Sequence, residues 1–161
     1  MYNIRHWVLF IFNSDIKETA LNRAEDNWKM EIIYRLDTTP LTEIIIDLYR
    51  SSGINRPTVD KERITKMYLH SNLVVTAWDQ DKLVGIARSL TDFCFCCYLS
   101  DLAVRKEYQK LGIGKKLISL TREKIGDQSM LLLLSAPTAM GYYPKVDFRK
   151  LENGFIIDRV K

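Results

Sequence analysis

The stretch that decides the fold is Arg105-Lys-Glu-Tyr-Gln-Lys-Leu-Gly-Ile-Gly-Lys-Lys116, which joins a predicted strand to a predicted helix. Gly112 and Gly114 lie at this junction, and glycines leave backbone N–H groups able to turn toward an anion. The positive end of the following helix dipole adds to this preference, as do the side chains of Lys110, Lys115 and Lys116. The stretch therefore predicts a loop that binds phosphate or pyrophosphate, and the expected ligand is a phosphorylated cofactor.

The excess positive charge of the chain is concentrated in the same stretch. The 161 residues carry a net charge of +4, and residues 105–116 hold five basic side chains and one acid, which also gives +4. The remaining residues therefore sum to zero. Proteins that bind nucleic acid spread positive charge over a face or stripe, with aromatic residues between the charges where they stack on single strands. A nucleic-acid-binding module is disfavoured, and a steep salt dependence of DNA or RNA affinity would reveal one.

Three glycine-rich motifs compete for this loop, and the spacing separates them. A Walker A loop needs a second Gly five residues after the first, followed by Lys and Ser or Thr, and neither glycine supplies that frame. A dinucleotide-binding fingerprint needs a third Gly where this chain has Leu117. The remaining match is Gln/Arg-x-x-Gly-x-Gly at residues 109–114, the pyrophosphate loop of acetyl-CoA-dependent acetyltransferases. A helix start without any ligand stays an alternative, because six residues make a short pattern.

Length and composition predict one globular domain. A chain with 47% hydrophobic and 27% charged residues can bury a full core. We expect the domain to span residues 30–161, after an N-terminal extension, 1–29, whose structure the sequence does not decide. The sequence contains no run of eighteen apolar residues, so it predicts no membrane span. The apolar stretch 7–12 is too short for a signal-peptide core and lacks a cleavage site, so we expect a cytoplasmic protein without a membrane partner.

The three cysteines predict structural thiols. Cys94, Cys96 and Cys97 lie in an apolar segment that is typical of a buried strand, and alternation turns the first two to one side and the third to the other. His6 and His70 are distant and show no ligand spacing. We therefore expect reduced cysteines that pack as small hydrophobes, and no metal.

The hydrophobic pattern predicts a mixed α/β (α+β) fold. Apolar spacing and turn signals divide the chain into strands 30–36, 73–78, 82–90, 93–104 and 130–134, helices 41–50, 60–69 and 114–126, and a short helix 136–145. Asn153-Gly154 then gives the strongest hairpin signature of the chain, between strands 148–151 and 155–160. This order predicts a largely antiparallel sheet flanked by helices.

The element order and three motifs resemble the GNAT superfamily of N-acetyltransferases over residues 30–161. The motifs are Leu102-Ala103-Val104, the loop 109–114 and Tyr142-Tyr-Pro-Lys-Val-Asp-Phe148. The resemblance implies that acetyl-CoA binds at the splayed centre of the sheet. It implies an acetyl-CoA-dependent N-acetyltransferase in which a primary amine of a small molecule or peptide attacks the thioester directly. Dimerisation is common among such relatives, so a homodimer stays open. A CoA-binding regulatory domain without turnover is the alternative.

The resemblance also assigns the residues that hold the cofactor. Main-chain groups at Leu102 and Val104 would contact the pantetheine arm and the thioester carbonyl, and the N–H of Val104 would stabilise the oxyanion. The loop N–H groups would hold the pyrophosphate. The expected cofactor-binding residues are Leu102, Ala103, Val104, Gln109, Lys110, Leu111, Gly112, Ile113, Gly114 and Lys115.

Tyr143 occupies the position of the proton donor that the family uses to protonate the leaving thiolate. A tyrosine that merely packs is the alternative interpretation. The chain departs from the family pattern at Asp147, which replaces a common Gly before Phe148. This departure bears on the local turn more than on the chemistry, because Asp tolerates left-handed backbone angles better than most residues.

The general base and the acceptor site are less defined. Some branches carry Glu or His at the positions of Ser100 and Tyr98, which are no bases near neutral pH but are candidate substrate contacts. Asp101 would face the other way unless a bulge intervenes, so a water relay is favoured. We expect the loop 51–58 to wall the acceptor site, with help from the Asn153-Gly154 hairpin, and with Arg56 as a ligand for a carboxylate or as a solvated cation.

Overall fold

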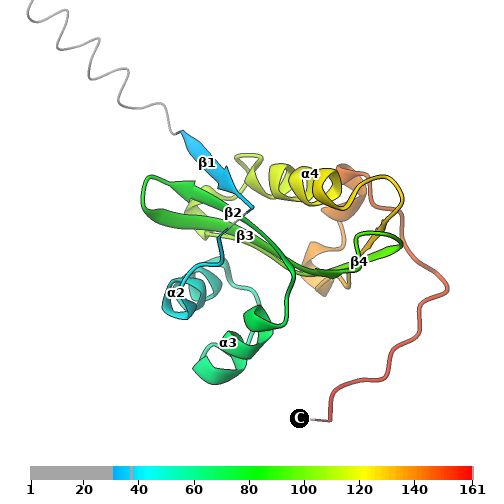
Figure 1. Cartoon of the computed structure of the whole chain (residues 1–161), viewed down its shortest axis with the longest axis horizontal. Coiled ribbons are helices and arrows are strands. Elements are labelled where there is room, and N and C mark those ends of the chain that lie inside the picture. The colour runs from blue at the N-terminus through cyan, green and yellow to red at the C-terminus, as the bar shows by residue number, and fades with distance from the viewer. Residues whose placement is uncertain (1–30, 37, 161) are drawn as a thin grey trace, which may run out of the picture.

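The computed structural model describes residues 31–36 and 38–160, and they form one five-stranded sheet with the order β1-β2-β3-β4-β5 (Figure 1). The strands are β1 (Ile32–Arg35), β2 (Leu73–Asp79), β3 (Lys82–Thr91), β4 (Cys96–Val104) and β5 (Met130–Leu132). The first four strands pair antiparallel, and β5 runs parallel to β4. The predicted mixed, largely antiparallel sheet is confirmed. The predicted extension 1–29 lies outside the described residues.

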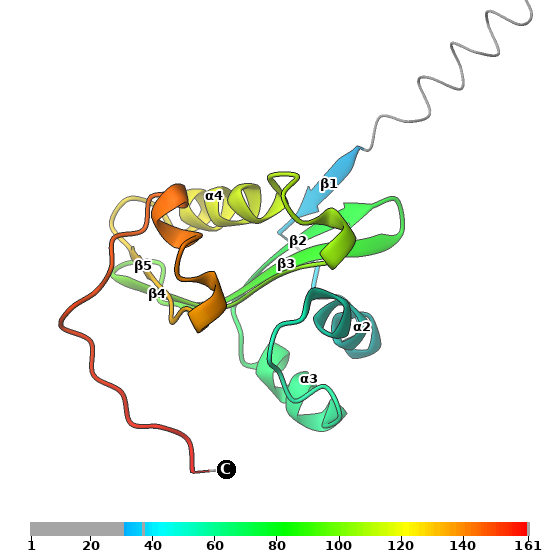
Figure 2. The same cartoon turned by 180° about the vertical axis from the view of Figure 1, so that it is seen from behind.

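Three α-helices cover the two faces of the sheet. Helices α2 (Thr42–Ser52) and α3 (Lys61–Leu69) lie on one face and α4 (Ile113–Ile125) on the other, as Figures 1 and 2 show. Three 3-10 turns complete the described elements: η1 (Lys106–Tyr108), η2 (Pro137–Ala139) and η3 (Tyr143–Val146). No helix in the described residues is long and apolar enough to cross a membrane.

Each face of the sheet has its own core. On the α4 face, Ile113 and Leu117 pack on the strands, and Gly85 of β3 allows their close approach. A Cβ on Gly85 would lie 3.0 Å from Cγ2 of Ile113 and 3.1 Å from Cδ1 of Leu117. On the other face, the buried side chains of Tyr49 and Ile64 bring α2 and α3 against the sheet. The Leu102-Ala103-Val104 motif at the end of β4 therefore lies between two packed layers.

A bulge in β4 changes the direction of its side chains. The register with β3 pairs Arg88 with Asp101 but Ser89 with Leu99, so Ser100 is the extra residue. Before the bulge, Leu99 packs in the α4 core; after it, Leu102 packs there instead, and Asp101 points to the α2–α3 face. The bulge that alternation would have required for Asp101 is present.

Strands β4 and β5 separate soon after they meet. Their pairing covers only Cys96, Cys97 and Tyr98 of β4. Beyond Tyr98, the edge of β4 that faces β5 continues to Val104 without a partner strand. The sheet therefore opens between β4 and its parallel neighbour β5, which is the edge strand.

The predicted strand from Phe93 begins only at Cys96. The carboxylate of Asp92 accepts hydrogen bonds from the N–H groups of Cys94, Phe95 and Cys96 at 2.8 to 3.0 Å and closes a turn there. Cys94 and Cys96 are exposed and only Cys97 is buried, so two of the three thiols do not pack as predicted. All three cysteines are free. The error has a physical reason, because an Asp side chain competes with the strand for backbone N–H groups.

The predicted strands at the C-terminus do not form. We call residues 149–160 the C-terminal segment; they contain no strand, all of them are exposed, and they run away from the sheet (Figure 1). The predicted strand 130–134 is likewise shorter than expected, and Met130 and Leu134 at its ends are more than half exposed. A two-stranded hairpin is marginal in water unless its apolar side chains reach a partner surface. The Asn153-Gly154 hairpin prediction is therefore wrong for this structure.

Candidate functional site

The loop at residues 109–114, here named the anion loop, presents a row of unpaired backbone amides. Gly112 caps α4 with φ of +83°, and Lys110 also has a positive φ, of +67°. The first helical hydrogen bond is donated by Lys116 N–H to Gly112 O at 3.0 Å. Within the described chain, the amides of residues 110–115 therefore donate to no backbone or side-chain acceptor. Such a helix start attracts anions.

Gln109 fixes the anion loop to the end of β4. Its side-chain Nε2 donates to the carbonyl of Val104 at 3.0 Å and, more weakly, to the carbonyl of Ser52 at 3.4 Å. The first contact ties the loop to the strand motif and the second ties it to α2. Gln109 thus positions the loop through its side chain, and the neighbouring residues offer their backbone.

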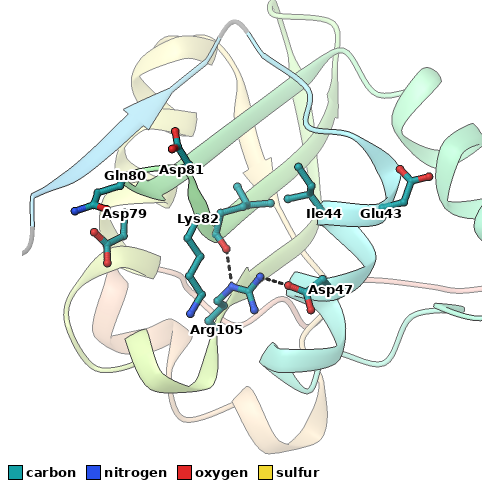
Figure 3. Close-up of a pocket in the computed structure, with 9 residues that line it drawn as sticks. Glu43, Ile44, Asp47, Asp79, Gln80, Asp81, Lys82 and Arg105 are labelled. Carbon is teal, nitrogen blue, oxygen red and sulfur yellow. Dashed lines mark hydrogen bonds and ion pairs between the residues drawn. The ribbon is translucent and has the colours of Figure 1, made fainter.

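The basic residues of the stretch divide into two groups. Arg105 is buried, donates from Nε to Leu83 O at 2.7 Å and forms an ion pair with Asp47, as Figure 3 shows. Its charge is therefore used inside the protein. The four lysines are exposed; Lys106 lies in η1, and Lys110, Lys115 and Lys116 lie around the anion loop. These three lysines, and not all five basic residues, can attract a phosphorylated ligand.

A cavity of about 600 Å³ lies next to Arg105 (Figure 3). It is lined by Glu43, Ile44, Asp47, Asp79, Gln80, Asp81, Lys82, Leu83 and Arg105. A second cavity, of about 550 Å³, lies between α4 and η3. The glycines of the anion loop line neither of them. The excess of carboxylates in the first cavity is opposite to what a phosphate requires, so we place the candidate site at the loop amides and the open strand edge.

The unpaired edge of β4 carries the backbone groups of Leu102 and Val104. The N–H of Arg105 donates to Val84 O on β3 at 2.9 Å. Because successive residues of a strand direct their backbone groups to opposite edges, Val104 and Leu102 direct theirs away from β3. The bond from Gln109 to Val104 O lies on that open edge. The two predicted strand positions are therefore the ones with accessible main-chain groups.

Some of the other predicted cofactor residues can offer only their backbone to a ligand. The side chain of Ala103 is buried against α2 and α3, and that of Ile113 is buried under α4. Leu111 projects its side chain outward and is 55% exposed. The structure thus brings the predicted residues together as a continuous backbone surface from the end of β4 to the first turn of α4.

Tyr143 lies in η3, on the α4 face. Its ring packs edge-on against Phe148 and Tyr142, with centroid distances of 5.6 and 5.4 Å, and is partly buried against the α4 core. Burial raises the pKa of the Tyr143 phenol, the neighbouring Tyr142 adds to the rise, and the charge of Arg56 opposes it. The phenol is therefore protonated at neutral pH, as a proton donor must be. Asp147 has φ of +68°, so it takes the left-handed turn that the family's Gly would take.

Tyr142 contacts the anion loop, which the sequence did not predict. A Cβ on Gly114 would lie only 2.9 Å from the Tyr142 hydroxyl. A glycine is therefore required at position 114 because Tyr142 packs closely against it. At Gly112 a Cβ would meet no atom within 4 Å, so a glycine is favoured there by its positive φ. Adjacent aromatic residues signal packing, but they do not say which of the two reaches the loop.

The predicted acceptor residues belong to a group of charges on the α2–α3 face. We call Arg56, Arg88 and Asp101 the charge cluster. The buried Asp101 accepts from Arg56 Nε at 2.5 Å and from Arg88 Nε. Arg56 Nη2 also donates to the Ser100 carbonyl, and Arg88 Nη2 donates to the Ser100 hydroxyl, each at 2.7 Å. Asp101 and Ser100 therefore hold both arginines, and alternation places Tyr98 on the same face.

Sequence reasoning missed three members of this network. Tyr49 donates to Asp101 at 2.7 Å and shares a 2.6 Å hydrogen bond with Tyr68. Burial raises the pKa of both phenols, so they stay neutral. Burial alone would lower the pKa of Arg88, but Asp101 raises it overall. The sequence did contain a signal: Arg88 interrupts the apolar pattern of the predicted strand 82–90, and Asp101 interrupts that of the next predicted strand, 93–104.

A family comparison agrees with this geometry. A model of the acetyltransferase (GNAT) domain matches residues 49–160, which include the charge cluster, the open strand edge, the anion loop and Tyr143. The chain belongs to the GNAT acetyltransferase family. The predicted membership is confirmed, and the chain is an acetyltransferase of the GNAT type.

Relatives in other organisms carry the same kind of name. The chain is 26% identical over 168 residues to a protein of Pyropia yezoensis named "Uncharacterized N-acetyltransferase ycf52", with 92% of this chain and 93% of the relative covered. It is 24% identical over 139 residues to the ycf52-like N-acetyltransferase of Prochlorococcus marinus, with 83% and 74% covered. This GNAT chain is thus similar to the relatives over most of their length.

Solved structures share the fold. A probable acetyltransferase from meticillin-resistant Staphylococcus aureus superposes with a TM-score of 0.69 at 24% identity and covers 80% of this chain and 100% of its own. An aminoglycoside acetyltransferase from an uncultured soil sample gives 0.59 at 22% identity, with 81% and 97% covered. At these identities the likeness concerns the fold and leaves the acceptor of this GNAT chain to its own residues.

Proposed function

We infer that this GNAT acetyltransferase is an N-acetyltransferase that takes the acetyl group from acetyl-CoA and transfers it to a primary amine of a small molecule or a peptide. One observation carries the inference: unpaired amides of residues 110–115 lie at the start of α4, directly after the open edge of β4. The loop fits a diphosphate, because several convergent N–H donors, a helix N-terminus and three exposed lysines suit its charge. The strand edge then suits an amide-rich arm that leads to a thioester.

The reaction requires a neutral amine whose nitrogen attacks the acetyl carbon, so that a C–N bond forms and the C–S bond breaks. The backbone N–H of Val104 would donate to the carbonyl oxygen, where negative charge develops. Tyr143 would give its proton to the departing sulfur. Alignment of both reactants along one strand edge supplies much of the acceleration, on the order of 7 to 11 kcal/mol for well-oriented groups.

Proton removal from the amine is assigned to water. Ser100 and Tyr98 are not bases near neutral pH, and the Asp101 carboxylate accepts hydrogen bonds from two arginines and a tyrosine. The carboxylate is also only 1% exposed, so its oxygens are engaged inside the protein and do not reach a bound amine. An ordered water that passes the proton to solvent therefore completes the proposed reaction.

The test begins with isothermal titration of acetyl-CoA into the protein, followed by a screen of amines in an assay for released CoA thiol. We expect saturable binding with protection from thermal unfolding, and product with at least one amine class. Absence of both heat and protection would contradict the proposal. Transfer to a hydroxyl acceptor alone would contradict its amine part.

The alternative is a CoA-binding domain without turnover. It is favoured by one observation: Asp101, the carboxylate nearest to the family's base positions, is consumed in the charge cluster. This alternative predicts tight binding of acetyl-CoA without thiol release above the rate of spontaneous hydrolysis for every amine tested. The same pair of assays therefore separates the two functions.

A further inference from the structure

The charge cluster bears a net positive charge beside the predicted acceptor site. It contains two arginines and one aspartate; Tyr49, which donates to Asp101, and Tyr68, which hydrogen-bonds Tyr49, are neutral, so its sum is +1. In the described residues, Asp101 is the acid of the ion pairs of both Arg56 and Arg88. Arg88 is 5% exposed and Asp101 is 1% exposed. The buried pair Arg88–Asp101 therefore fixes the cluster in place, and the positive excess is carried outward by the partly exposed Arg56.

Arg56 is the member of the cluster that a ligand can reach. Its side chain is 27% exposed, whereas the other two are nearly or fully covered. Three of its donors are used: Nε for Asp101, Nη1 for the carbonyl of Asn55 at 2.6 Å, and Nη2 for the carbonyl of Ser100. A guanidinium has five N–H donors, so one N–H remains on each terminal nitrogen. Asp101 thus holds the guanidinium in place and leaves two donors for another acceptor.

The position of Arg56 connects it to the reaction. Its Nη2 contacts β4 at Ser100, two residues before Leu102, whose backbone lies on the open edge. Its charge is also close enough to Tyr143 to act on the phenol pKa. A ligand on Arg56 would therefore lie next to the strand edge, on the acceptor side.

We propose that the acceptor of this acetyltransferase is an amine that also carries a carboxylate, which the terminal N–H groups of Arg56 bind while Asp101 holds the guanidinium. The proposal rests on the proposed function and names its substrate class. Arginine and carboxylate form charge-assisted, often bidentate hydrogen bonds. We expect polyamines and other polycationic amines to be poor acceptors, because the net positive charge of the cluster repels them.

Two kinds of molecule could supply such a carboxylate: a free amino acid, or a peptide with an acidic side chain near its N-terminus. The assay therefore compares amino acids with their amides, and N-terminal Ala-Asp peptides with the matched Ala-Asn peptides, with spermidine as the polycation. We expect kcat/KM to be at least about tenfold higher for the carboxylate member of one of these pairs, the scale of one charge-assisted hydrogen bond. The pair that responds identifies the source.

Variants assign the preference to Arg56. Arg56→Gln should remove the tenfold difference, mainly through KM, and Arg56→Lys should restore part of it. Arg50→Gln is the matched control, because Arg50 is an exposed arginine in the last turn of α2, just before the same loop, and its side-chain hydrogen bond within the described residues goes to Thr58 O; this variant should keep the preference. The Kd of acetyl-CoA and the melting temperature are measured for each variant. Unchanged values show that a variant has lost substrate recognition and not its fold.

The outcomes are distinguishable. Equal rates for the carboxylate and amide members of both pairs, or a preference for spermidine, would overturn the proposal and leave the acetyltransferase function intact. Retention of the preference in Arg56→Gln would overturn the role of Arg56. Failure of the wild-type protein to bind acetyl-CoA would instead overturn the proposed function itself.

Discussion

Two regions of this acetyltransferase carried strong local signals, and only one of them formed the predicted structure. The anion loop adopts the predicted strand-to-helix turn, with Gly112 at a positive φ. The C-terminal segment contains the best hairpin signature of the sequence but forms no strand. The loop is held to β4 and α2 by Gln109 and packs against Tyr142 at Gly114, whereas side chains such as Phe155 and Ile157 are almost fully exposed. A local signal becomes structure where tertiary contacts support it.

The sharpest contrast between the two regions is expected from two aspartates. Asp101→Ala, in the strand β4 that leads to the loop, leaves the buried Arg88 without its counter-charge and should lower the free energy of unfolding by about 3 to 5 kcal/mol. Asp158→Ala, in the C-terminal segment, removes an exposed carboxylate and should change it by less than about 0.5 kcal/mol. Urea denaturation measures both values. Similar values for the two variants would mean that the charge cluster does not support the fold as described.

Tyr143 and Phe155 extend the contrast from stability to turnover. Tyr143→Phe removes the proposed proton donor and should lower kcat about 10²-fold with little change in the Kd of acetyl-CoA. Phe155→Leu should leave kcat unchanged. Burial raises the pKa of Tyr143 above its ordinary value of 10.0, so the donor stays protonated below that pH and the wild-type rate should fall only in more alkaline buffer. An unchanged kcat in Tyr143→Phe would reduce this residue to a packing role.

Gly112 can be compared with a glycine at the other end of the same helix. Gly112 and Gly126 both have positive φ, of +83° and +75°, and a Cβ would meet no atom within 4 Å at either. Valine should therefore cost roughly 1 to 3 kcal/mol of backbone strain at either position, and more at Gly126, whose ψ of 173° lies in a region that is nearly restricted to Gly. Only Gly112→Val should also weaken acetyl-CoA binding, by about tenfold or more. Titration calorimetry decides this, and equal affinity in both variants would contradict an anion site at the loop.

Gly154→Ala should have the smallest effect. Gly154 does not have a positive φ, and an added Cβ would approach only the flexible end of the exposed Leu151 side chain, at 3.2 Å. The free energy of unfolding should therefore change by less than about 0.5 kcal/mol. A type I′ hairpin would need a positive φ at this glycine, so a loss of 1 kcal/mol or more would show that the hairpin forms in solution after all.

Some features were predictable because they depend on a few neighbouring residues. The αL glycine at Gly112 and the apolar periodicity of α4 identify the loop and its helix without knowledge of the rest of the fold. The Asp92 turn was also readable, because an Asp followed by unpaired N–H groups competes with a strand. The apolar residues that follow Asp92 instead led to the prediction of a strand from Phe93.

Other features depend on register and on distant contacts. The direction of Asp101 follows from a bulge that exists only in the pairing of β4 with β3. The approach of Tyr142 to Gly114 joins residues from η3 and α4. The C-terminal segment fails for the opposite reason, because in the described residues it finds no surface to cover its apolar side chains. Sequence patterns report what an element prefers, and they do not report which partners it meets.

The extra residue at Ser100 makes β4 sensitive to changes in length. Removal of one residue there would restore strict alternation along β4. The acidic and apolar side chains on one side of the bulge would then move to the opposite faces of the sheet, although no residue type would change. Substitutions in this strand therefore act one residue at a time, whereas an insertion or a deletion reassigns every later position at once. Variation among homologues should accordingly conserve the spacing between Tyr98 and Val104 more strictly than the identities of the residues between them.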